Sequence, residues 1–163
     1  MTPAARRAEA GTVTILLFWV TLFVVVAIAM HAYFGPKVAR ARGDGTVEIE
    51  RSRDGHYYVA GAVNGVPVVF MVDTGASTVV VGGRIGAALG QGTPVQMNTA
   101  GGHVVAEVTR DNTVSAGGIT VEGLRVAVIA NLRGSDALLG QNFLRHVEVT
   151  TARDRMMLRI PEH

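Results

Sequence analysis

The distribution of apolar and polar residues divides the chain into two parts. From Ala10 to Pro36 no residue carries a full charge, and Val13 to Met30 is almost wholly apolar. This uncharged length suits a membrane-spanning helix and exceeds the apolar core of a typical secretory signal peptide. We therefore predict a tail over residues 1–11 and a transmembrane anchor over residues 12–34. A cleaved signal is the alternative, because Ala27-Ile28-Ala29 has the small-x-small pattern of a cleavage site.

A polar, glycine-containing linker over residues 35–45 separates the apolar segment from a region of short alternating runs. Such runs, bounded by turn residues, are typical of β-strands. Asp54-Gly55 and Asn64-Gly65 suit two-residue hairpin turns, whose central residues need positive φ, so they predict three consecutive antiparallel strands. The predicted strands are Val47–Arg53, His56–Val63, Val66–Val72, Thr78–Val81, Val95–Ala100, His103–Thr109, Asn112–Ser115, Ile119–Ala130, Ala137–Gly140, His146–Thr151 and Met156–Ile160. No run has the length of a buried helix, so residues 46–163 are predicted to form an all-β domain, a closed sandwich or barrel.

Asp73 lies between two of the most apolar of these strands. Val68 to Val72 precedes it, and the small residues Thr74-Gly75-Ala76-Ser77 separate it from Thr78 to Val81. The small residues predict a tight turn, which places the carboxylate on a loop between two core strands. A charge there costs desolvation energy unless it is paired or used, which favours a functional carboxylate. An ordinary turn is the alternative, because Asp, Thr and Gly are common turn residues.

Composition narrows the chemistry. The chain has no cysteine, which excludes disulfides, thiol catalysis and cysteine-based zinc sites. Its five histidines are scattered without ligand spacing, so we expect neither a metal site nor a cofactor. Beyond residue 35, 13 Arg or Lys are balanced by 12 Asp or Glu, so no basic face for nucleic acid is predicted. The other aspartates fall in polar turns or linkers, where a solvated role is the default: Asp44, Asp54, Asp111, Asp136 and Asp154.

Two motifs carry a resemblance to a known family. Val72-Asp73-Thr74-Gly75-Ala76-Ser77 resembles the catalytic signature of aspartic proteases, and Leu138-Leu139-Gly140, followed by Gln141, resembles the motif that closes their second loop. Between the motifs, at the flap position, lies a glycine-tipped hairpin made of Ala100, Gly101, Gly102 and His103. In this order the chain is similar to the retropepsin-like aspartic proteases, especially the small membrane-anchored members of bacteria, over about residues 46–161. The resemblance implies a closed acid-protease barrel, hydrolysis of peptide bonds by Asp73, and no cofactor.

The resemblance agrees with an argument about number. Aspartic proteolysis needs two carboxylates that share one proton around a water molecule, because like charges so close cannot both ionise. The chain has one candidate loop, so we predict a homodimer in which the two Asp73 side chains meet on a two-fold axis.

The family pattern also implies roles for the neighbouring residues. Thr74 is expected to hold the two loops together, Gly75 to leave room for the substrate backbone, and Ala76, Ser77 and the flap to contact the peptide. Retroviral members pair an acidic residue at the position of Ser77 with an arginine at the position of Gln141. A neutral hydrogen bond between Ser77 and Gln141 is expected to substitute for that ion pair here.

Two other functions remain as alternatives. One is a retropepsin-like fold kept for dimerisation or peptide capture without turnover, and the other is a lipid-binding β-barrel beside the membrane. The intact Asp73-Thr74-Gly75 argues against both.

The membrane face of the domain is a separate question. Similarity to the anchored bacterial proteases, together with the short tail that carries Arg6 and Arg7, predicts a catalytic domain on the periplasmic face of a bacterial inner membrane. The larger number of basic residues after the anchor favours the cytoplasmic face by the positive-inside rule, so both orientations stay open.

Overall fold

The structure is a computed structural model that describes residues 3–34, 38–39, 45–99, 101–132 and 136–161. The chain divides into two compact units, Met1–Gly35 and Pro36–His163.

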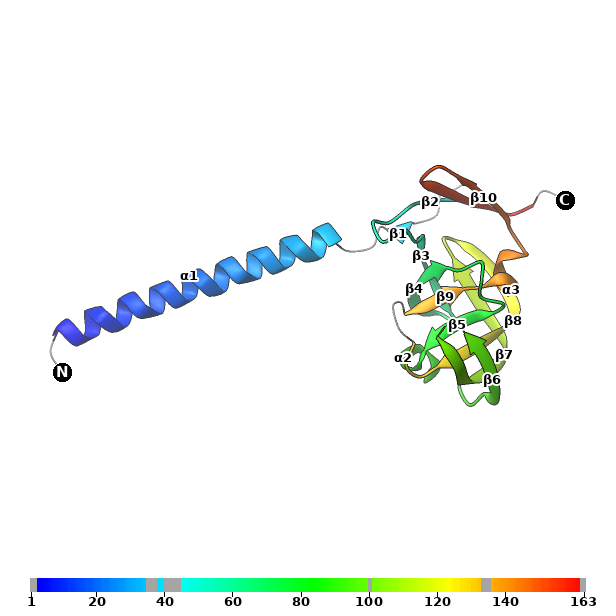
Figure 1. Cartoon of the computed structure of the whole chain (residues 1–163), viewed down its shortest axis with the longest axis horizontal. Coiled ribbons are helices and arrows are strands. Elements are labelled where there is room, and N and C mark those ends of the chain that lie inside the picture. The colour runs from blue at the N-terminus through cyan, green and yellow to red at the C-terminus, as the bar shows by residue number, and fades with distance from the viewer. Residues whose placement is uncertain (1–2, 35–37, 40–44, 100, 133–135, 162–163) are drawn as a thin grey trace. The chain divides into compact units, whose positions relative to one another are not determined.

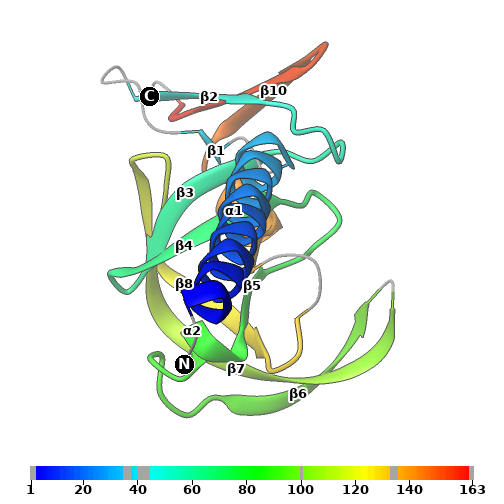
Figure 2. The ribbon, with the colours of Figure 1, turned by 90° about the vertical axis from the view of Figure 1, so that its left-hand side faces the viewer.

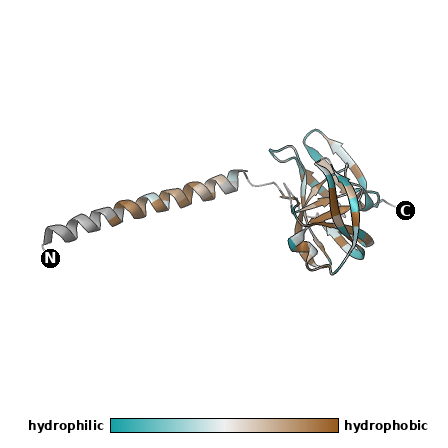
Figure 3. Cartoon of the chain, turned by 60° about the horizontal axis from the view of Figure 1, so that its bottom comes forward, coloured by the Kyte–Doolittle hydropathy of each residue, from teal (hydrophilic) through white to brown (hydrophobic). Residues whose placement is uncertain are grey.

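The first unit contains α1 (Pro3–Phe34), a 32-residue helix that includes the segment predicted as an anchor. Its large apolar side chains from Val13 to Met30 are exposed and colour the middle of the helix brown in Figure 3. Within the described ranges, no helix satisfies the length and apolarity needed to cross a membrane. The anchoring role therefore rests on the sequence alone.

The second unit is built almost entirely from β-strands (Figure 1). In chain order its elements are β1 (Val38–Ala39), β2 (Thr46–Glu50), β3 (Tyr58–Val63), β4 (Val66–Val72), β5 (Val79–Gly82), α2 (Gly83–Gly86), β6 (Thr93–Thr99), β7 (Gly102–Ala116), β8 (Ile119–Ile129), β9 (Ala137–Leu139), α3 (Gln141–Leu144), β10 (Glu148–Ala152) and β11 (Arg155–Arg159). Each of its two helices has four residues. The predicted all-β class is confirmed for this unit, and β1 falls inside the stretch that was predicted as a linker.

The larger sheet closes on itself. It contains eight strands in the order β1-β3-β4-β9-β5-β8-β7-β6, and an additional pairing of β3 with β7 closes six of them into a ring. Strand β9 runs parallel to β4 and antiparallel to β5, so a strand from late in the chain lies between the two strands that flank Asp73. A separate three-stranded sheet, β10-β11-β2, lies at the opposite end of the unit from the β6–β7 hairpin (Figure 2).

Alternating side chains build two apolar clusters on opposite faces of the barrel wall. Val79 and Val81 of β5 pack inside the barrel with the fully buried Phe70 and Phe143. Val80, between them, faces outward into a smaller cluster beneath the β6–β7 hairpin, together with Ala106 and Ala127. Fully burying one valine or leucine side chain contributes about 1.5–3 kcal/mol, so the hairpin is attached to the barrel by its own apolar contacts.

One predicted hairpin is confirmed, and the other forms only at its turn. Asn64 and Gly65 take the positive φ values of 48° and 81° that their turn needs, and β3 pairs with β4 from Val63–Val66 onward. Strand β2, in contrast, pairs with β11, and the segment between β2 and β3 pairs only next to its turn, through the bridge of Arg51 with Tyr57 and the bond from the Ser52 N–H to the carbonyl of His56 at 2.8 Å. The three consecutive antiparallel strands are therefore two, with β2 belonging to the other sheet.

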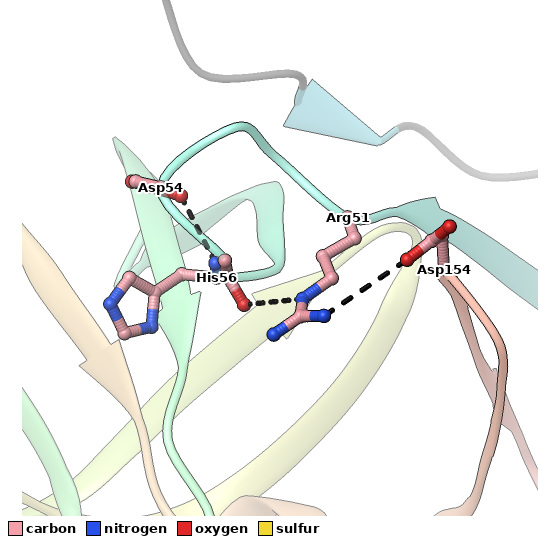
Figure 4. A network of polar contacts seen from close by, with 5 residues as sticks. Arg51, Asp54, His56 and Asp154 are labelled. Atoms are coloured by element: carbon pink, nitrogen blue, oxygen red, sulfur yellow. Dashed lines mark hydrogen bonds and ion pairs between the residues drawn. The ribbon is translucent and has the colours of Figure 1, made fainter.

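Polar contacts hold the turn between β2 and β3 (Figure 4). The Arg51 Nε donates to a backbone carbonyl of the turn at 2.9 Å, and its guanidinium lies 4.0 Å from the carboxylate of Asp154. Asp54 accepts from the backbone N–H of His56 at 3.0 Å and from the Tyr58 hydroxyl at 2.6 Å. The hydrogen bond from the Tyr58 hydroxyl lowers the pKa of Asp54 most, and the bond from the His56 N–H lowers it further. Burial, followed by the hydrogen bond to the Asp54 carboxylate, raises the pKa of Tyr58 to about 12. These bonds stabilise a tight turn over residues 52–55, in which the Gly55 N–H donates to the carbonyl of Ser52 at 3.0 Å and Gly55 has a φ of 88°.

Strand β7 joins two strands that were predicted to be separate. The sequence pattern breaks at Arg110 and Asp111, but the structure continues through them with a shift of register between Thr109 and Asn112. Asp111 has a φ of 56°, and the buried Asn112 donates from Nδ2 to Thr109 Oγ1 and to the carbonyl of Leu124. The side chain of Asn112 thus satisfies the backbone and hydroxyl groups that the irregularity exposes, and the strand does not end there.

Candidate active site

Asp73 is positioned by the strand that precedes it and by β9. β4 ends at Val72, which pairs with Leu139, and the backbone N–H of Asp73 donates to the carbonyl of Leu139 at 3.1 Å. The half-buried Asp73 carboxylate accepts, through Oδ1, the backbone N–H of Gly75 at 2.8 Å. A short loop therefore orients the carboxylate at the point where two parallel strands end. We call residues 73–78 the Asp73 loop.

Gln141, the first residue of α3, holds this loop with two hydrogen bonds. Its backbone N–H donates to the carbonyl of Ala76 at 2.8 Å, and its side-chain Nε2 donates to the carbonyl of Thr74 at 2.9 Å. The prediction that Gln141 bonds to Ser77 is wrong. The side-chain amide of Gln141 bonds to the backbone of Thr74, and Ser77 is exposed. A neutral amide thus fixes the loop through the main chain, where retroviral members use an ion pair between side chains.

The Leu138-Leu139-Gly140 motif fits closely beneath the loop. Leu139 is fully buried in the barrel, and Leu138 packs on the other face against the outer cluster. A Cβ atom on Gly140 would lie 2.2 Å from the carbonyl oxygen of Thr78 and 2.9 Å from that of Ala76. Such distances are far inside van der Waals contact. The backbone of the Asp73 loop at Ala76 and Thr78 therefore packs directly against the backbone of Gly140.

Asn142 is a positioning residue that the sequence interpretation missed. Its side chain is 7% exposed, accepts the backbone N–H of Val79 at 2.8 Å and donates to the carbonyl of Arg125 at 2.8 Å. The Thr78 hydroxyl donates to the same Arg125 carbonyl at 2.9 Å. Asn142 therefore ties together α3, β5 and β8 just behind the Asp73 loop. Its signal in the sequence is an amide that directly follows Gln141 and precedes two large apolar residues.

The predicted flap is the tip of the β6–β7 hairpin. Gly101, Gly102 and His103 are exposed there, and the Thr99 hydroxyl donates to the carbonyl of Gly102 at 2.8 Å. Ala100, the other predicted flap residue, lies outside the described residues. In Figure 2 the hairpin of β6 and β7 lies at the bottom of the view and extends to the right, away from the barrel.

A cavity of about 260 Å³ opens between the hairpin and the Asp73 loop. Ser77 and Thr78 of the loop line one side, and residues of β6, β7 and β8 line the remainder. The cavity is therefore placed to receive a side chain of a molecule that contacts the loop. Among the described residues no group of three or more His, Cys, Asp or Glu side chains comes together to hold a metal ion.

Taken together, a closed β-barrel, an Asp-Thr-Gly loop braced by a Leu-Leu-Gly strand and a hairpin beside the loop define the retropepsin-like class of aspartic proteases. A family model described as "gag-polyprotein putative aspartyl protease" matches residues 59–146, a range that contains the Asp73 loop, the hairpin and the Leu138–Gln141 motif. The chain belongs to this retropepsin-like family, as the sequence motifs predicted.

Two proteins of Rickettsia species are similar to parts of the chain. The crystal structure of a retropepsin-like aspartic protease from Rickettsia conorii is similar, with a TM-score of 0.57 and 29% sequence identity. That similarity covers 70% of this chain and 88% of the other. The uncharacterized protein RP867 of Rickettsia prowazekii (strain Madrid E) is 54% identical over 35 residues, which are 22% of this chain. The matched part spans only 15% of that protein's length.

Proposed function

We propose that the chain is an aspartic endopeptidase that acts as a homodimer. The observation that carries the proposal is the Asp73 loop, in which the Gly75 N–H orients the carboxylate and Gln141 fixes the backbone. Each chain supplies one such loop. A complete site therefore needs Asp73 from a second copy, across a two-fold axis.

In this dimer the two Asp73 carboxylates share one proton and hold a water molecule between them. The ionised carboxylate takes a proton from the water as the water attacks the peptide carbonyl, and the protonated carboxyl group donates to the developing oxyanion. Thr74 holds the two loops together, Gly75 leaves room for the substrate backbone, and Ala76 and Ser77 line the path of the peptide. The β6–β7 hairpin closes over the peptide and excludes water.

Cleavage of peptides by the purified full chain tests the catalytic part of this proposal. Asp73→Asn is expected to abolish cleavage and keep the fold, because the amide preserves shape but cannot act as base. Asp136→Asn is the matched control, since the exposed Asp136 carboxylate lies in an ion pair with Arg84 at 3.4 Å, away from the Asp73 loop contacts. Cleavage by Asp73→Asn at the wild-type rate would show that Asp73 is not the catalyst. Binding of peptides by the wild-type chain without cleavage would favour the non-catalytic module.

Mixing experiments test the homodimer. In a ninefold excess of Asp73→Asn chains, random pairing leaves about one wild-type chain in ten with a wild-type partner, so activity per wild-type chain falls about tenfold. Dilution is expected to lower specific activity as well, because the site dissociates with the dimer. A fully active species that sediments as a monomer would overturn the proposal.

We propose further that residues 12–34 anchor the chain in a bacterial inner membrane, with the protease domain on the periplasmic face. Support comes from the uncharged stretch Ala10–Pro36 and from the similarity to the anchored bacterial proteases. Anchoring raises the local concentration of chains and so favours the dimer. A C-terminal alkaline phosphatase fusion is expected to be active and a fluorescent-protein fusion dark. The reverse pattern would place the domain in the cytoplasm, as the basic residues after the anchor favour.

A further inference from the structure

The cavity beside the Asp73 loop combines an apolar wall with two cationic side chains. Val95 and Met97 of β6 and Val108 of β7 form the apolar wall. Arg110 of β7 and Arg125 of β8 also line the cavity. A cavity for an aliphatic substrate side chain needs no charged lining, so the two arginines indicate a more specific ligand.

Strand register explains why these residues converge. Thr93 pairs with Val108 across the β6–β7 hairpin, and side chains two residues apart on a strand point to the same face. Val95 and Met97 therefore follow Thr93 along β6, while Arg110 follows Val108 along β7. The hairpin that carries the flap thus also delivers one arginine to the cavity.

Arg125 reaches the cavity from the barrel wall, and its backbone is fixed. Its carbonyl accepts two hydrogen bonds, from the Thr78 hydroxyl at 2.9 Å and from Asn142 Nδ2 at 2.8 Å. The first of these comes from the Asp73 loop itself. The position of Arg125 is therefore set relative to the loop that carries the candidate catalytic carboxylate.

Arg110 and Arg125 form no ion pair among the residues that the structure describes. Ion pairs in that part of the chain include those of Arg51, Arg84, Arg155 and Arg159, none of which lines the cavity. Both residues are exposed and line the cavity, so a ligand in the cavity can reach their side chains. Two positive charges at one cavity raise the local concentration of a negative ligand and disfavour a positive one.

We infer that this cavity is a subsite for an acidic side chain of the peptide substrate, glutamate in particular. This inference rests on the proposed peptidase function and adds a substrate class to it. The methylene groups of glutamate lie along Val95, Met97 and Val108, and its carboxylate reaches Arg110 and Arg125. Because Ser77 and Thr78 line the same cavity, the acidic residue lies among the residues that flank the scissile bond.

A binding experiment tests this inference without requiring turnover. Full-length Asp73→Asn chain is titrated with fluorescent peptides that have glutamate, glutamine or lysine at each of the four positions on either side of an apolar pair. At one position we expect glutamate to bind about three- to thirtyfold more tightly than glutamine, the range for two partly exposed ion pairs, and lysine to bind most weakly. The preference is expected to shrink in 1 M salt, because screening weakens exposed pairs.

Substitution of the arginines identifies the residues responsible. In Arg110→Gln combined with Arg125→Gln, the ratio of glutamate to glutamine affinity is expected to fall to about one. Arg84→Gln, an exposed arginine that does not line the cavity, is the control and is expected to keep the preference. Equal affinities for glutamate and glutamine at every position, or a preference that survives the double substitution, would overturn the inference.

Cleavage by the wild-type chain separates the two proposals. If peptides are cleaved without any preference for glutamate, the subsite is wrong and the peptidase stands. If no peptide is cleaved but the glutamate preference and its loss on substitution are observed, the peptidase is wrong and the acidic subsite stands as a binding site.

Discussion

Replacing Gly140 with alanine tests how the Asp73 loop is held in place. The new Cβ atom would lie 2.2 Å from the carbonyl oxygen of Thr78, 2.5 Å from its carbonyl carbon and 2.9 Å from the carbonyl oxygen of Ala76. All three atoms belong to backbone, which cannot turn aside as a flexible side chain does. The φ of Gly140 is −91°, so alanine meets no conformational strain there and the whole effect comes from the collision.

The size of the effect follows from the contacts that must yield. Forcing a methyl group into a filled site costs about 1–3 kcal/mol. Moving the loop away also weakens the bond from the Gln141 N–H to the carbonyl of Ala76, which costs about 0.5–1.5 kcal/mol more. Alanine restricts the unfolded chain and returns about 0.4–1 kcal/mol. We therefore expect the free energy of unfolding to fall by about 0.5–4 kcal/mol, with loss of peptide cleavage because the carboxylate moves with the loop.

Urea unfolding followed by circular dichroism, beside a cleavage assay, measures both effects. Gly82→Ala is the matched control: Gly82 also ends a strand before a four-residue helix in extended backbone, but its Cβ would meet nothing closer than 3.5 Å. We expect this control to unfold at the wild-type urea concentration or slightly above it. If Gly140→Ala matched the control in both stability and activity, the close packing of the Leu-Leu-Gly motif beneath the loop would not be what holds Asp73.

Three further predictions concern the contacts around the loop. Asn142→Ala leaves the buried N–H of Val79 without its partner and removes one of the two donors to the carbonyl of Arg125, so the free energy of unfolding is expected to fall by about 1–3 kcal/mol in urea titrations. Tyr58 has its pKa raised to about 12, so it stabilises the fold below the unfolded pKa of about 10, and this contribution is lost as the pH rises from about 10 to 12. In Tyr58→Phe the urea midpoint is expected to lose that part of its alkaline decrease, whereas Tyr57→Phe keeps it. Gln141→Ala releases the carbonyl of Thr74, so kcat for peptide cleavage is expected to fall about tenfold or more with a smaller change in KM, because the catalytic geometry is affected more than substrate contact.

Each of these predictions has an outcome that contradicts it. Asn142→Ala with the urea midpoint of Asn131→Ala, an exposed residue, would mean that the buried amide contributes nothing. An unchanged alkaline profile in Tyr58→Phe would assign that decrease to other groups. If Ser77→Ala lowered kcat as much as Gln141→Ala, the loop would depend on Ser77 after all.

Local patterns in the sequence were sufficient for most strands and for the family. A strand with one buried face repeats every two residues, and Asn64-Gly65 specifies its hairpin through its own positive φ values, so both can be read from neighbouring residues. The Asp73-Thr74-Gly75 and Leu138-Leu139-Gly140 motifs are equally local, and they identified the family before any contact between them was known.

What the sequence could not specify depends on pairing between distant residues. The partner of β2 is β11, about 110 residues away, so the turn at Asp54-Gly55 could not show that the strand before it joins the other sheet. The partner of Gln141 became clear only when α3 was placed against the carbonyl of Thr74, 67 residues earlier. The cavity with Arg110 and Arg125 likewise exists because β7 continues through its bulge and β8 packs beside the loop. The sequence by itself determined which residues form strands and turns and which motif carries the carboxylate. The tertiary structure alone decided which distant groups hold and surround that carboxylate, because closing the barrel brings them together.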